Sequence, residues 1–302
     1  MALKYWLLLS RIPFLSVMIL PYILGALLAS KLSGDFSWLV FLFGLCGSIL
    51  IQLASHYSGE VYDVHEDRLS ISLEKNFFSG GSQVLVENHV APKNVKILIA
   101  VVIFFALIIG LILQFYFKTG RLTLFLGISG VIGGLFYSMP PLRWVSRGLG
   151  ELLIAYAFGW LAVNAGFYIQ ASRFDILATL VSFPVSCAVV NIILINEYPD
   201  YPADKLAAKQ NLLVRIGKEK GAFLYTGLAV ISVLTFTLSL AKGLPFISGI
   251  FYLPVLIMAI ILASQMLKKA YNNRQSLEKM CALTILVSLG TSLSMVLGLL
   301  IR

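Results

Sequence analysis

Hydrophobic residues run along this chain in long, unbroken stretches that are separated by short polar connectors. A helix needs about 20 apolar residues to cross the ~30 Å hydrocarbon core of a bilayer, and nine stretches approach that length. Their residues do not alternate between apolar and polar, as the strands of a membrane barrel do. The pattern therefore predicts an all-α, polytopic membrane protein, a single domain over residues 1–302 with nine transmembrane helices. The expected spans are 13–31, 37–57, 95–117, 122–140, 150–170, 174–195, 221–241, 245–265 and 280–301.

Composition excludes an ordinary soluble domain. Hydrophobic residues make up 59% of the chain and charged residues 12%, and the mean hydropathy is +0.91. Soluble domains carry about twice that share of charged residues. The net charge of +9 does not indicate a nucleic-acid partner, because the basic residues are scattered through short connectors and form no continuous patch. Lipid is the partner that the composition predicts.

The distribution of basic residues predicts the orientation in the membrane. If the N-terminus is cytoplasmic, 17 of the 23 Lys and Arg residues lie on the cytoplasmic side, as the positive-inside rule requires. We therefore expect a multi-pass protein of the cytoplasmic membrane with its N-terminus in the cytoplasm. Two connectors on that side are long, about 58–94 and 196–220. Long loops often carry function, so these two are the expected active-site loops.

Acidic residues are concentrated in the same two connectors, which hold ten of the 14 in the chain. The first begins GEVYDVHEDR at Gly59 and the second begins NEYPDYPADK at Asn196. Both contain E-x-x-D-x-x-x-D followed by a basic residue, and the two copies are offset by 137 positions. Residues three and four apart share one face of a helix, so each copy predicts a strip of three carboxylates. The strips are Glu60, Asp63 and Asp67 in the first connector and Glu197, Asp200 and Asp204 in the second.

Two facing strips of carboxylates repel each other unless a cation lies between them. Mg2+ is commonly held by a few carboxylates, with water and phosphate oxygens completing its coordination, so the strips predict a site for Mg2+ and a phosphorylated substrate. The alternative is a set of solvated loop charges, against which the repeated register argues. Basic residues near the strips are candidates for phosphate contacts, although each alone is more typical of the positive-inside rule. They are Arg68, Arg143, Lys205 and Lys209.

These features resemble the UbiA superfamily of intramembrane prenyltransferases, whose two signatures have the form N-D-x-x-D-x-x-x-D. Asn196, Glu197, Asp200 and Asp204 match one signature with a conservative change of Asp to Glu. The segments SRIPFLSVMILPYILGALLA (10–29) and FYSMPPLRWVSRGLGELLIAYAFG (136–159) resemble the 1,4-dihydroxy-2-naphthoate polyprenyltransferase branch. There are two departures. Gly59 stands where the first signature usually has Asn, and Gln83 stands where related sequences often have Arg.

The resemblance implies Mg2+-dependent transfer of a prenyl group from a polyprenyl diphosphate to an aromatic acceptor, 1,4-dihydroxy-2-naphthoate in menaquinone biosynthesis. It leaves open other acceptors, namely 4-hydroxybenzoate, a glycerol-phosphate lipid, and a haem or chlorophyll precursor. It also implies roles for individual residues. The catalytic residues would be Asp63, Asp67, Asp200 and Asp204, which would hold Mg2+ together with Glu60, Asn196 and Glu197, while Arg68, Arg143, Lys205 and Lys209 would bind the diphosphate.

A cation-coupled transporter is the alternative from another class. Transport sites usually lie near the bilayer midplane on broken helices, whereas these acids fall at the ends of the expected spans.

Polar residues inside the apolar stretches are candidates for the acceptor pocket. Charged and polar groups are costly inside a membrane and often mark a functional site. Gln52 and His56 precede Glu60 at steps of four residues, and Asn164 lies within the fifth expected span. With Tyr137, these residues are expected to line a dry pocket, because an allylic cation beside water would be quenched. The alternative for the polar ones is hydrogen bonding between helices.

Overall fold

The computed structural model describes residues 2–73 and 81–301, and every regular element in these ranges is helical, which confirms the all-α prediction. Two π-helical segments interrupt longer helices, η1 (Ile112–Tyr116) after α5 and η3 (Ala155–Leu161) between α7 and α8. Short 3-10 turns form η2 (Trp144–Ser146) and η4 (Ala270–Asn272). The α-helices are α1 (Ala2–Ser10), α2 (Ile12–Ser33), α3 (Trp38–Tyr62), α4 (Val64–Leu73), α5 (Pro92–Leu111), α6 (Thr123–Phe136), α7 (Gly150–Ile154), α8 (Ala162–Ala171), α9 (Ile176–Leu206), α10 (Leu212–Ile216), α11 (Lys218–Ala241), α12 (Ile247–Leu267) and α13 (Arg274–Leu300).

Eight helical stretches of the described chain are long and apolar enough to cross a membrane. They match eight of the nine expected spans, with Pro92–Tyr116 and Gly150–Ala171 each counted as one stretch. The other expected span, 122–140, is the 14-residue α6, which rises only about 21 Å at 1.5 Å per residue. It ends early because Pro140 and Pro141 follow, and proline cannot continue a helix. The expected nine full spans are therefore eight full spans and one short helix.

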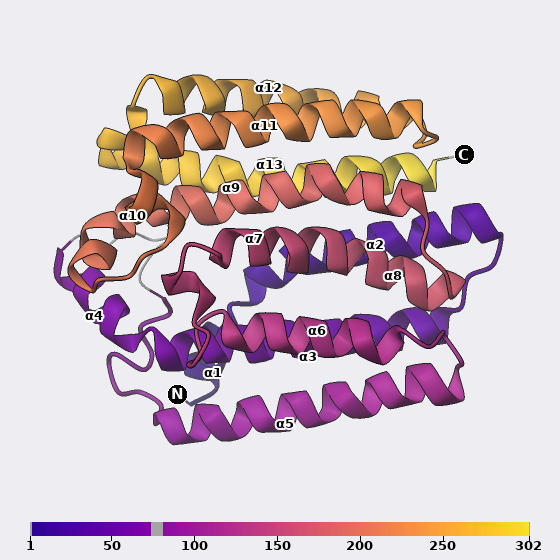
Figure 1. Ribbon diagram of the computed structural model, residues 1–302, viewed down its shortest axis with the longest axis horizontal. Helices are drawn as coiled ribbons and strands as arrows, with labels where there is room; N and C mark the ends of the chain where they lie inside the picture. Colours follow the sequence, from indigo (N-terminus) through magenta and orange to yellow (C-terminus); the bar gives the residue numbers. More distant parts are fainter. Residues whose placement is uncertain (1, 74–80, 302) are drawn as a thin grey trace.

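The helices lie side by side in an elongated bundle, with the short helices α4 and α10 at one end (Figure 1). Helix α9 has 31 residues and rises about 46 Å, so its last turns extend beyond an apolar core of ~30 Å. It contacts α4, α11 and α13. Helix α4 carries Asp67, the last acid of the first strip, and contacts α9, which carries the second strip. Both acidic strips therefore lie at the same end of the bundle.

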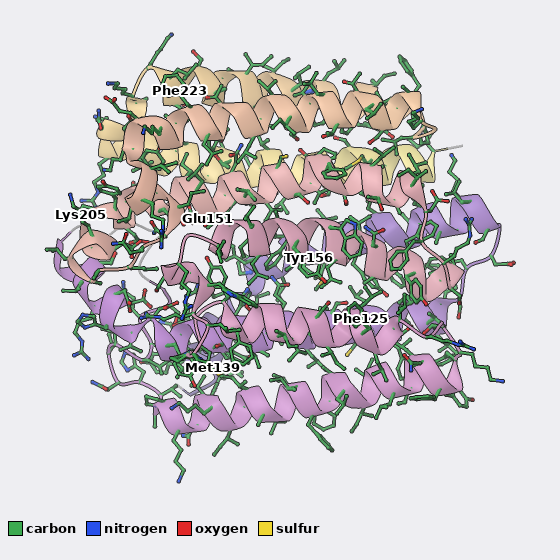
Figure 2. All side chains as sticks on the ribbon, viewed as in Figure 1. Phe125, Met139, Glu151, Tyr156, Lys205 and Phe223 are labelled. Carbon is green, nitrogen blue, oxygen red and sulfur yellow. The ribbon has the colours of Figure 1, made fainter. Side chains whose placement is uncertain are left out.

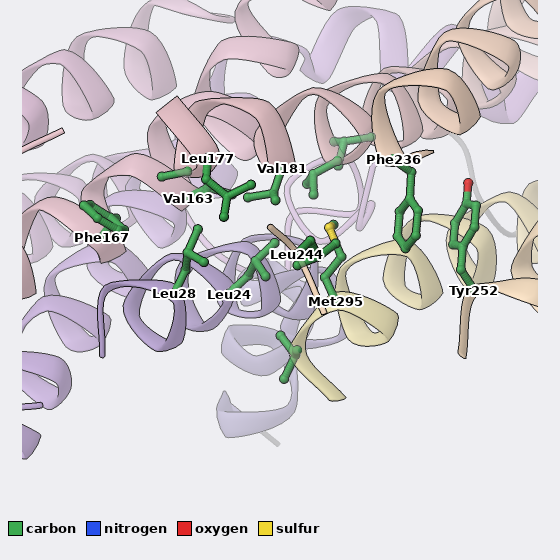
Figure 3. Packing of buried hydrophobic residues seen from close by; sticks show 14 of the residues in the cluster. Leu24, Leu28, Val163, Phe167, Leu177, Val181, Phe236, Leu244, Tyr252 and Met295 are labelled. Carbon is green, nitrogen blue, oxygen red and sulfur yellow. The ribbon is translucent and has the colours of Figure 1, made fainter. Parts of the chain in front are cut away.

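Buried apolar side chains from α2, α8, α9, α11, α12 and α13 form the largest core cluster. In Figure 3, Leu24 and Leu28 of α2 face Val163 of α8, and the rings of Phe236 and Tyr252 stack with their centroids 3.9 Å apart. The outer faces are also apolar. Phe125 and Phe223, labelled in Figure 2, are 65% and 68% exposed. Such a large exposed apolar surface indicates contact with lipid.

Helices α2 and α8 approach each other closely because each carries a glycine at the contact. A Cβ atom at Gly25 would lie 1.8 Å from the backbone oxygen of Val163, and one at Gly166 would lie 2.2 Å from the backbone oxygen of Tyr22. No side chain fits at these distances. Phe14, near the start of the same helix α2, borders the cavity described below.

The substitution Gly25→Val is expected to destabilise the protein by about 3 kcal/mol or more, because overpacking is costly and backbone atoms cannot move aside as a side chain can. Thermal unfolding of the purified protein in detergent measures the effect. Gly227→Val is the matched control, since a Cβ at Gly227 meets no atom within 4 Å. Equal melting temperatures for the two variants would contradict the close helix contact.

Candidate active site

A cavity of about 260 Å³ lies between the ends of α3, α4 and α9. Asp63 and Asp67 line it from the first acidic segment, and Asp200 and Asp204 line it from the second. The structure therefore brings the four expected catalytic carboxylates to one space. Other residues singled out from the sequence also line this cavity, namely Gln52, His56, Gly59, Tyr137, Asn196, Glu197 and Lys209.

The two acidic strips differ in backbone conformation. The second strip lies within the continuous helix α9, although Pro199 and Pro202 are inside it. The first strip spans a bend, because α3 ends at Tyr62 and Asp63 forms its C-terminal cap. Helical hydrogen bonds continue through the bend, since Asp63 N donates to Gly59 O and Asp67 N donates to Asp63 O, each at 2.9 Å. The first strip is therefore divided between α3 and α4 by the bend at Asp63, whereas the second strip lies on one helix.

Asp63 is held by the turn that follows α6. Ser138 Oγ donates a hydrogen bond to Asp63 Oδ2 at 2.6 Å, and the Arg143 guanidinium lies 3.4 Å from Asp63 Oδ1. Arg143 also forms an ion pair with the buried Glu66. Arg143 does not line the cavity. Its contacts fix two carboxylates, and direct contact with a diphosphate stays a prediction.

A serine joins the two acidic strips. Ser70 Oγ of α4 donates to Asp200 Oδ1 of α9 at 2.6 Å. This hydrogen bond connects residues 130 positions apart in the chain. It holds α4 against the end of α9, so the relative position of the two strips does not depend on a bound ligand alone.

Lys209 is one of two cationic residues, with Arg11, that line the cavity in the described part of the chain. Its Nζ lies 3.4 Å from Asp204 Oδ1, and its side chain is only 15% exposed. Burial alone would lower the pKa of Lys209, but the nearby carboxylates of Asp204 and Asp63 outweigh burial and raise the pKa above its ordinary value. Lys209 therefore stays protonated beside the acids. Asn211 Nδ2 donates to Asp204 Oδ2 at 2.7 Å and holds the same carboxylate from the other side.

The loop that carries Lys209 is fixed by a buried carboxylate. Leu212 N, at the start of α10, donates to Glu151 Oε1 at 2.9 Å. Glu151 is 3% exposed, and Figure 2 shows it at the same end of the bundle as Lys205. This contact connects the α9–α10 loop to α7, which places Lys209 against the acids.

Glu60 does not line the cavity, and its carboxylate contacts Arg11 and Ser82. Its carboxylate pairs with Arg11 and accepts hydrogen bonds from Ser82 N at 2.9 Å and from Ser82 Oγ at 2.5 Å. Glu60 is 2% exposed and is not among the residues that line the cavity. Arg11 does line it. These contacts give Glu60 the role of holding Arg11 and the loop after residue 80, and metal binding by Glu60 stays a prediction.

Asp67 lies against a glycine of that loop. Gly81 has φ +65°, and a Cβ there would lie 2.2 Å from Asp67 Oδ2, so only glycine lets the carboxylate pack against the loop. Burial raises the pKa of Asp67 to about 8, with Glu60 and Asp63 adding to the effect and Arg11 opposing it. Burial and the neighbouring carboxylates therefore favour the neutral form of Asp67.

The residues present suit a hard cation that the substrate helps to hold. Within 2–73 and 81–301, no group of three or more His, Cys, Asp or Glu side chains is close enough to hold a metal ion alone. The strips offer oxygen donors to the cavity, and Asn196 Oδ1 is buried with no hydrogen-bond partner among the described residues. Mg2+ usually keeps several waters and binds through one or two carboxylates plus substrate phosphates. The donor set fits Mg2+ on these terms.

Besides Glu60 and Arg143, three of the predicted site residues do not line the cavity. Arg68 and Lys205 are exposed on the surface and do not line it. Asn164 is fully buried, donates from Nδ2 to Trp160 O at 2.9 Å, and accepts from Thr179 Oγ1 of α9 at 3.4 Å. The contacts of Asn164 favour the alternative of helix pairing over a place in the acceptor pocket.

The sequence reasoning did not single out Arg11, Ser70 or Ser138. The sequence does contain an indication that Arg11 is functional, because it is the one charged residue between Lys4 and Lys31 and it interrupts an apolar stretch. The sequence contains no such indication for Ser70 or Ser138. Serine is common in loops and helix ends, and only the folded chain shows that these two donate to Asp200 and Asp63.

Comparison with known proteins identifies the relatives of this chain. Residues 18–289 match the UbiA prenyltransferase family. The chain is 28% identical over 236 residues to 2-carboxy-1,4-naphthoquinone phytyltransferase of Synechocystis sp., covering 78% of this chain and 73% of that protein. It is 26% identical over 217 residues to 1,4-dihydroxy-2-naphthoate octaprenyltransferase of Bacillus subtilis, covering 71% of this chain and 66% of that protein. The names of both relatives agree with the branch that the sequence resembles.

Solved structures share the fold. A structure described as digeranylgeranylglyceryl phosphate synthase matches with a TM-score of 0.67 at 17% identity, covering 99% of this chain and 98% of that one. A UbiA homologue from Archaeoglobus fulgidus, bound to DMAPP and Mg2+, matches with a TM-score of 0.65 at 17% identity, covering 95% and 98%. Together with the family match over residues 18–289, these findings place the chain: it belongs to the UbiA prenyltransferase family and is a prenyltransferase of the membrane.

Proposed function

We propose that this enzyme transfers a prenyl group from an isoprenoid diphosphate to an aromatic acceptor, 1,4-dihydroxy-2-naphthoate, in menaquinone biosynthesis, and that it requires Mg2+. One observation carries the proposal. Carboxylates from two acidic segments 137 positions apart line one cavity together with the buried cation Lys209. The names of the relatives from Synechocystis sp. and Bacillus subtilis support a naphthoate acceptor, and the Archaeoglobus fulgidus structure with DMAPP and Mg2+ supports the metal.

The residues around the diphosphate have different roles. When bound, Mg2+ supplies Lewis-acid stabilisation of the charge on the departing diphosphate. Asp63, Asp67, Asp200 and Asp204 hold the metal–diphosphate end of the substrate, and Lys209 adds a fixed positive charge where the leaving group develops negative charge. Ser70 and Ser138 keep Asp200 and Asp63 in position. The carbon–oxygen bond breaks and the diphosphate leaves with the bonding electron pair. The allylic carbon bonds to a ring carbon, which then loses its proton, or its carboxylate as carbon dioxide, and the ring keeps the electron pair of that bond.

The inner part of the cavity is suited to an allylic cation because its walls are largely apolar. Phe14, Val17, Ile154, Phe158 and Val189 line it. These side chains keep water from the reacting carbon, which would otherwise be hydrolysed. Asp67 lies in α4 and Asp204 lies near the end of α9, and Figure 1 shows α4 and α10 at one end of the bundle. Transport sites, in contrast, usually lie near the midplane.

The test is an assay of the purified protein with radiolabelled geranylgeranyl diphosphate against a panel of acceptors. The panel contains 1,4-dihydroxy-2-naphthoate, 4-hydroxybenzoate and glycerol phosphate, each with Mg2+ and with EDTA. We expect a prenylated naphthoate in the presence of Mg2+ and none with EDTA. Product from another acceptor alone would refute the naphthoate assignment, and product that is unaffected by EDTA would refute the metal.

We place the acidic end of the bundle in the cytoplasm, on the basis of the positive-inside rule. In a background without native cysteines, single cysteines near Glu87 and Lys218 should react with an impermeant maleimide only from the cytoplasmic side. A cysteine near Lys118 should react only from outside. Labelling of the first two positions from opposite faces would contradict a shared active site.

Asn196 is expected to contribute an oxygen to the metal site. Losing a metal ligand or its orienting hydrogen bond typically costs about 10- to 100-fold in metal affinity or activity, so Asn196→Ala should raise the Mg2+ concentration for half-maximal rate by about that factor. Gly59 occupies the matching position in the first strip, and a Cβ there would lie 3.8 Å from Ser138 Oγ, an ordinary contact. Gly59→Asn should lower the Mg2+ requirement or leave it unchanged. An unchanged requirement in Asn196→Ala would show that carboxylates alone bind the metal.

A further inference from the structure

The polar cavity adjoins a second, apolar cavity that lies farther along α3 from the acids. The second cavity has a volume of about 100 Å³ and lies between α2, α3, α6 and the η3–α8 stretch. Gln52, Ser55 and Phe158 line both cavities. These three residues therefore form the junction between the two spaces.

Gln52 is the polar group at this junction with an unused hydrogen-bonding atom. The residue is 4% exposed, and its Oε1 is buried without a hydrogen-bond partner among the described residues. A buried acceptor that stays unpaired costs free energy comparable to a lost hydrogen bond. The position of Gln52 at the junction suggests that a ligand supplies the missing donor.

The neighbours of Gln52 determine which end of its amide faces the cavities. Its Nε2 lies 2.9 Å from Phe14 O and 3.4 Å from His56 Nε2. A backbone carbonyl can only accept, so the amide nitrogen must point at Phe14. His56 Nδ1 lies 2.9 Å from Ser10 O, another carbonyl, so in neutral His56 the proton is on Nδ1 and Nε2 accepts from Gln52. Both amide hydrogens are thus directed to protein atoms, and Oε1 is left for a ligand.

The chemistry of the two proposed substrates selects the partner of Gln52. A prenyl chain has no hydrogen-bond donor, and an ionised diphosphate has only acceptors. A hydroxyl group on the aromatic acceptor is the one donor that either substrate brings. Gln52 lies 11 residues before Asp63 on α3, about 16 Å along the helix axis. That length accommodates a diphosphate beside the acids and an aromatic ring next to it.

Resting on the proposed function, we infer that Gln52 Oε1 accepts a hydrogen bond from a ring hydroxyl of the aromatic acceptor at the junction of the two cavities. His56 is a positioning residue that holds the amide in the orientation this requires. The hydrogen bond fixes the ring by its oxygen, so that a ring carbon rather than the oxygen faces the allylic carbon. It also favours electron donation from the hydroxyl into the ring, which makes the ring carbon a better nucleophile.

The test measures binding of three naphthoates to purified protein by isothermal titration calorimetry, without prenyl diphosphate. The probes are 1,4-dihydroxy-2-naphthoate and the two analogues that each lack one hydroxyl. In the wild type, one analogue should bind about 10- to 100-fold more weakly than the parent. The hydroxyl that this analogue lacks is the donor to Gln52 Oε1, and without it the buried acceptor stays unpaired. In Gln52→Leu the parent and that analogue should bind within about twofold of each other. Gln170→Leu is the matched control and should keep the wild-type difference, since among the described residues the Gln170 side chain bonds to the backbone of Ser37.

The outcomes separate this inference from the proposed function. If the parent binds but the difference persists in Gln52→Leu, or if both analogues bind the wild type as tightly as the parent, Gln52 does not recognise a hydroxyl. If none of the three compounds binds the wild type, the naphthoate assignment fails together with this inference. Should Gln52→Leu not fold, Gln52→Met keeps the length of the side chain and takes its place, and the wild-type series alone still decides whether a hydroxyl is recognised.

Discussion

Replacing Asp63 or Asp200 with asparagine is expected to lower the rate of prenyl transfer by at least about 100-fold. Each side chain lines the cavity, and each belongs to a different strip. The substitution keeps the shape of the side chain but removes a negative charge that the metal needs. Asparagine can also still accept from Ser138 or Ser70, so the hydrogen bonds that position these residues are kept.

Single-turnover rates at saturating prenyl diphosphate and Mg2+ measure the effect. Asp175→Asn is the matched control. Asp175 caps the start of α9 by accepting from Leu177 N, and asparagine caps a helix equally well. We expect Asp175→Asn to retain the wild-type rate. A rate near that of the wild type in both Asp63→Asn and Asp200→Asn would refute the assignment of the strips to the metal–diphosphate site.

The substitution Lys209→Met is expected to lower the maximal rate by about 100- to 1,000-fold, the range typical for removing one group that stabilises developing charge. Lys209 Nζ lies against Asp204 and its side chain is largely buried, so no solvent ion can take its place without rearrangement. Lys209→Arg keeps the positive charge and should restore part of the rate.

Steady-state kinetics with varied prenyl diphosphate separate binding from the chemical step, and we expect the loss mainly in kcat. Lys220→Met serves as the control, because Lys220 is exposed at the start of α11. If Lys209→Met changes only the KM for prenyl diphosphate, Lys209 binds the substrate without stabilising the transition state.

Much of the fold follows from the sequence, because hydrophobic stretches in a membrane have few alternatives to helices. The expected spans coincide with eight long helices, and only α6 is shorter than expected. Its length could not be judged from hydropathy alone, since the apolar stretch continues into the turn before Pro140. The bend at Asp63 was also not predictable, because a helical hydrogen-bond pattern and a polar strip persist through it.

The aspartates of the candidate site could be predicted because the acidic pattern is repeated along the chain. Contacts between residues that are far apart in the sequence could not be predicted. The offset of 137 positions identified the four aspartates that line the cavity. It also suggested equal roles for Glu60 and Glu197, but Glu60 pairs with Arg11, which the sequence places 49 residues away. Arg68 and Lys205 follow the strips in both copies and yet face solvent. Neighbours in sequence on a helix turn to different sides, so adjacency to an acid does not place a basic residue in the site.

The most direct test of the account is to locate the metal in the protein bound to Mn2+ and a non-hydrolysable prenyl thiodiphosphate. Anomalous scattering from Mn2+ in crystals reveals its position without reference to activity. We expect the metal to lie within about 2.0–2.3 Å of carboxylate oxygens from both strips, in the range usual for hard divalent cations, with diphosphate oxygens completing the coordination beside Lys209. Metal bound to carboxylates of a single strip, or outside the cavity that Asp63 and Asp200 share, would contradict this expectation.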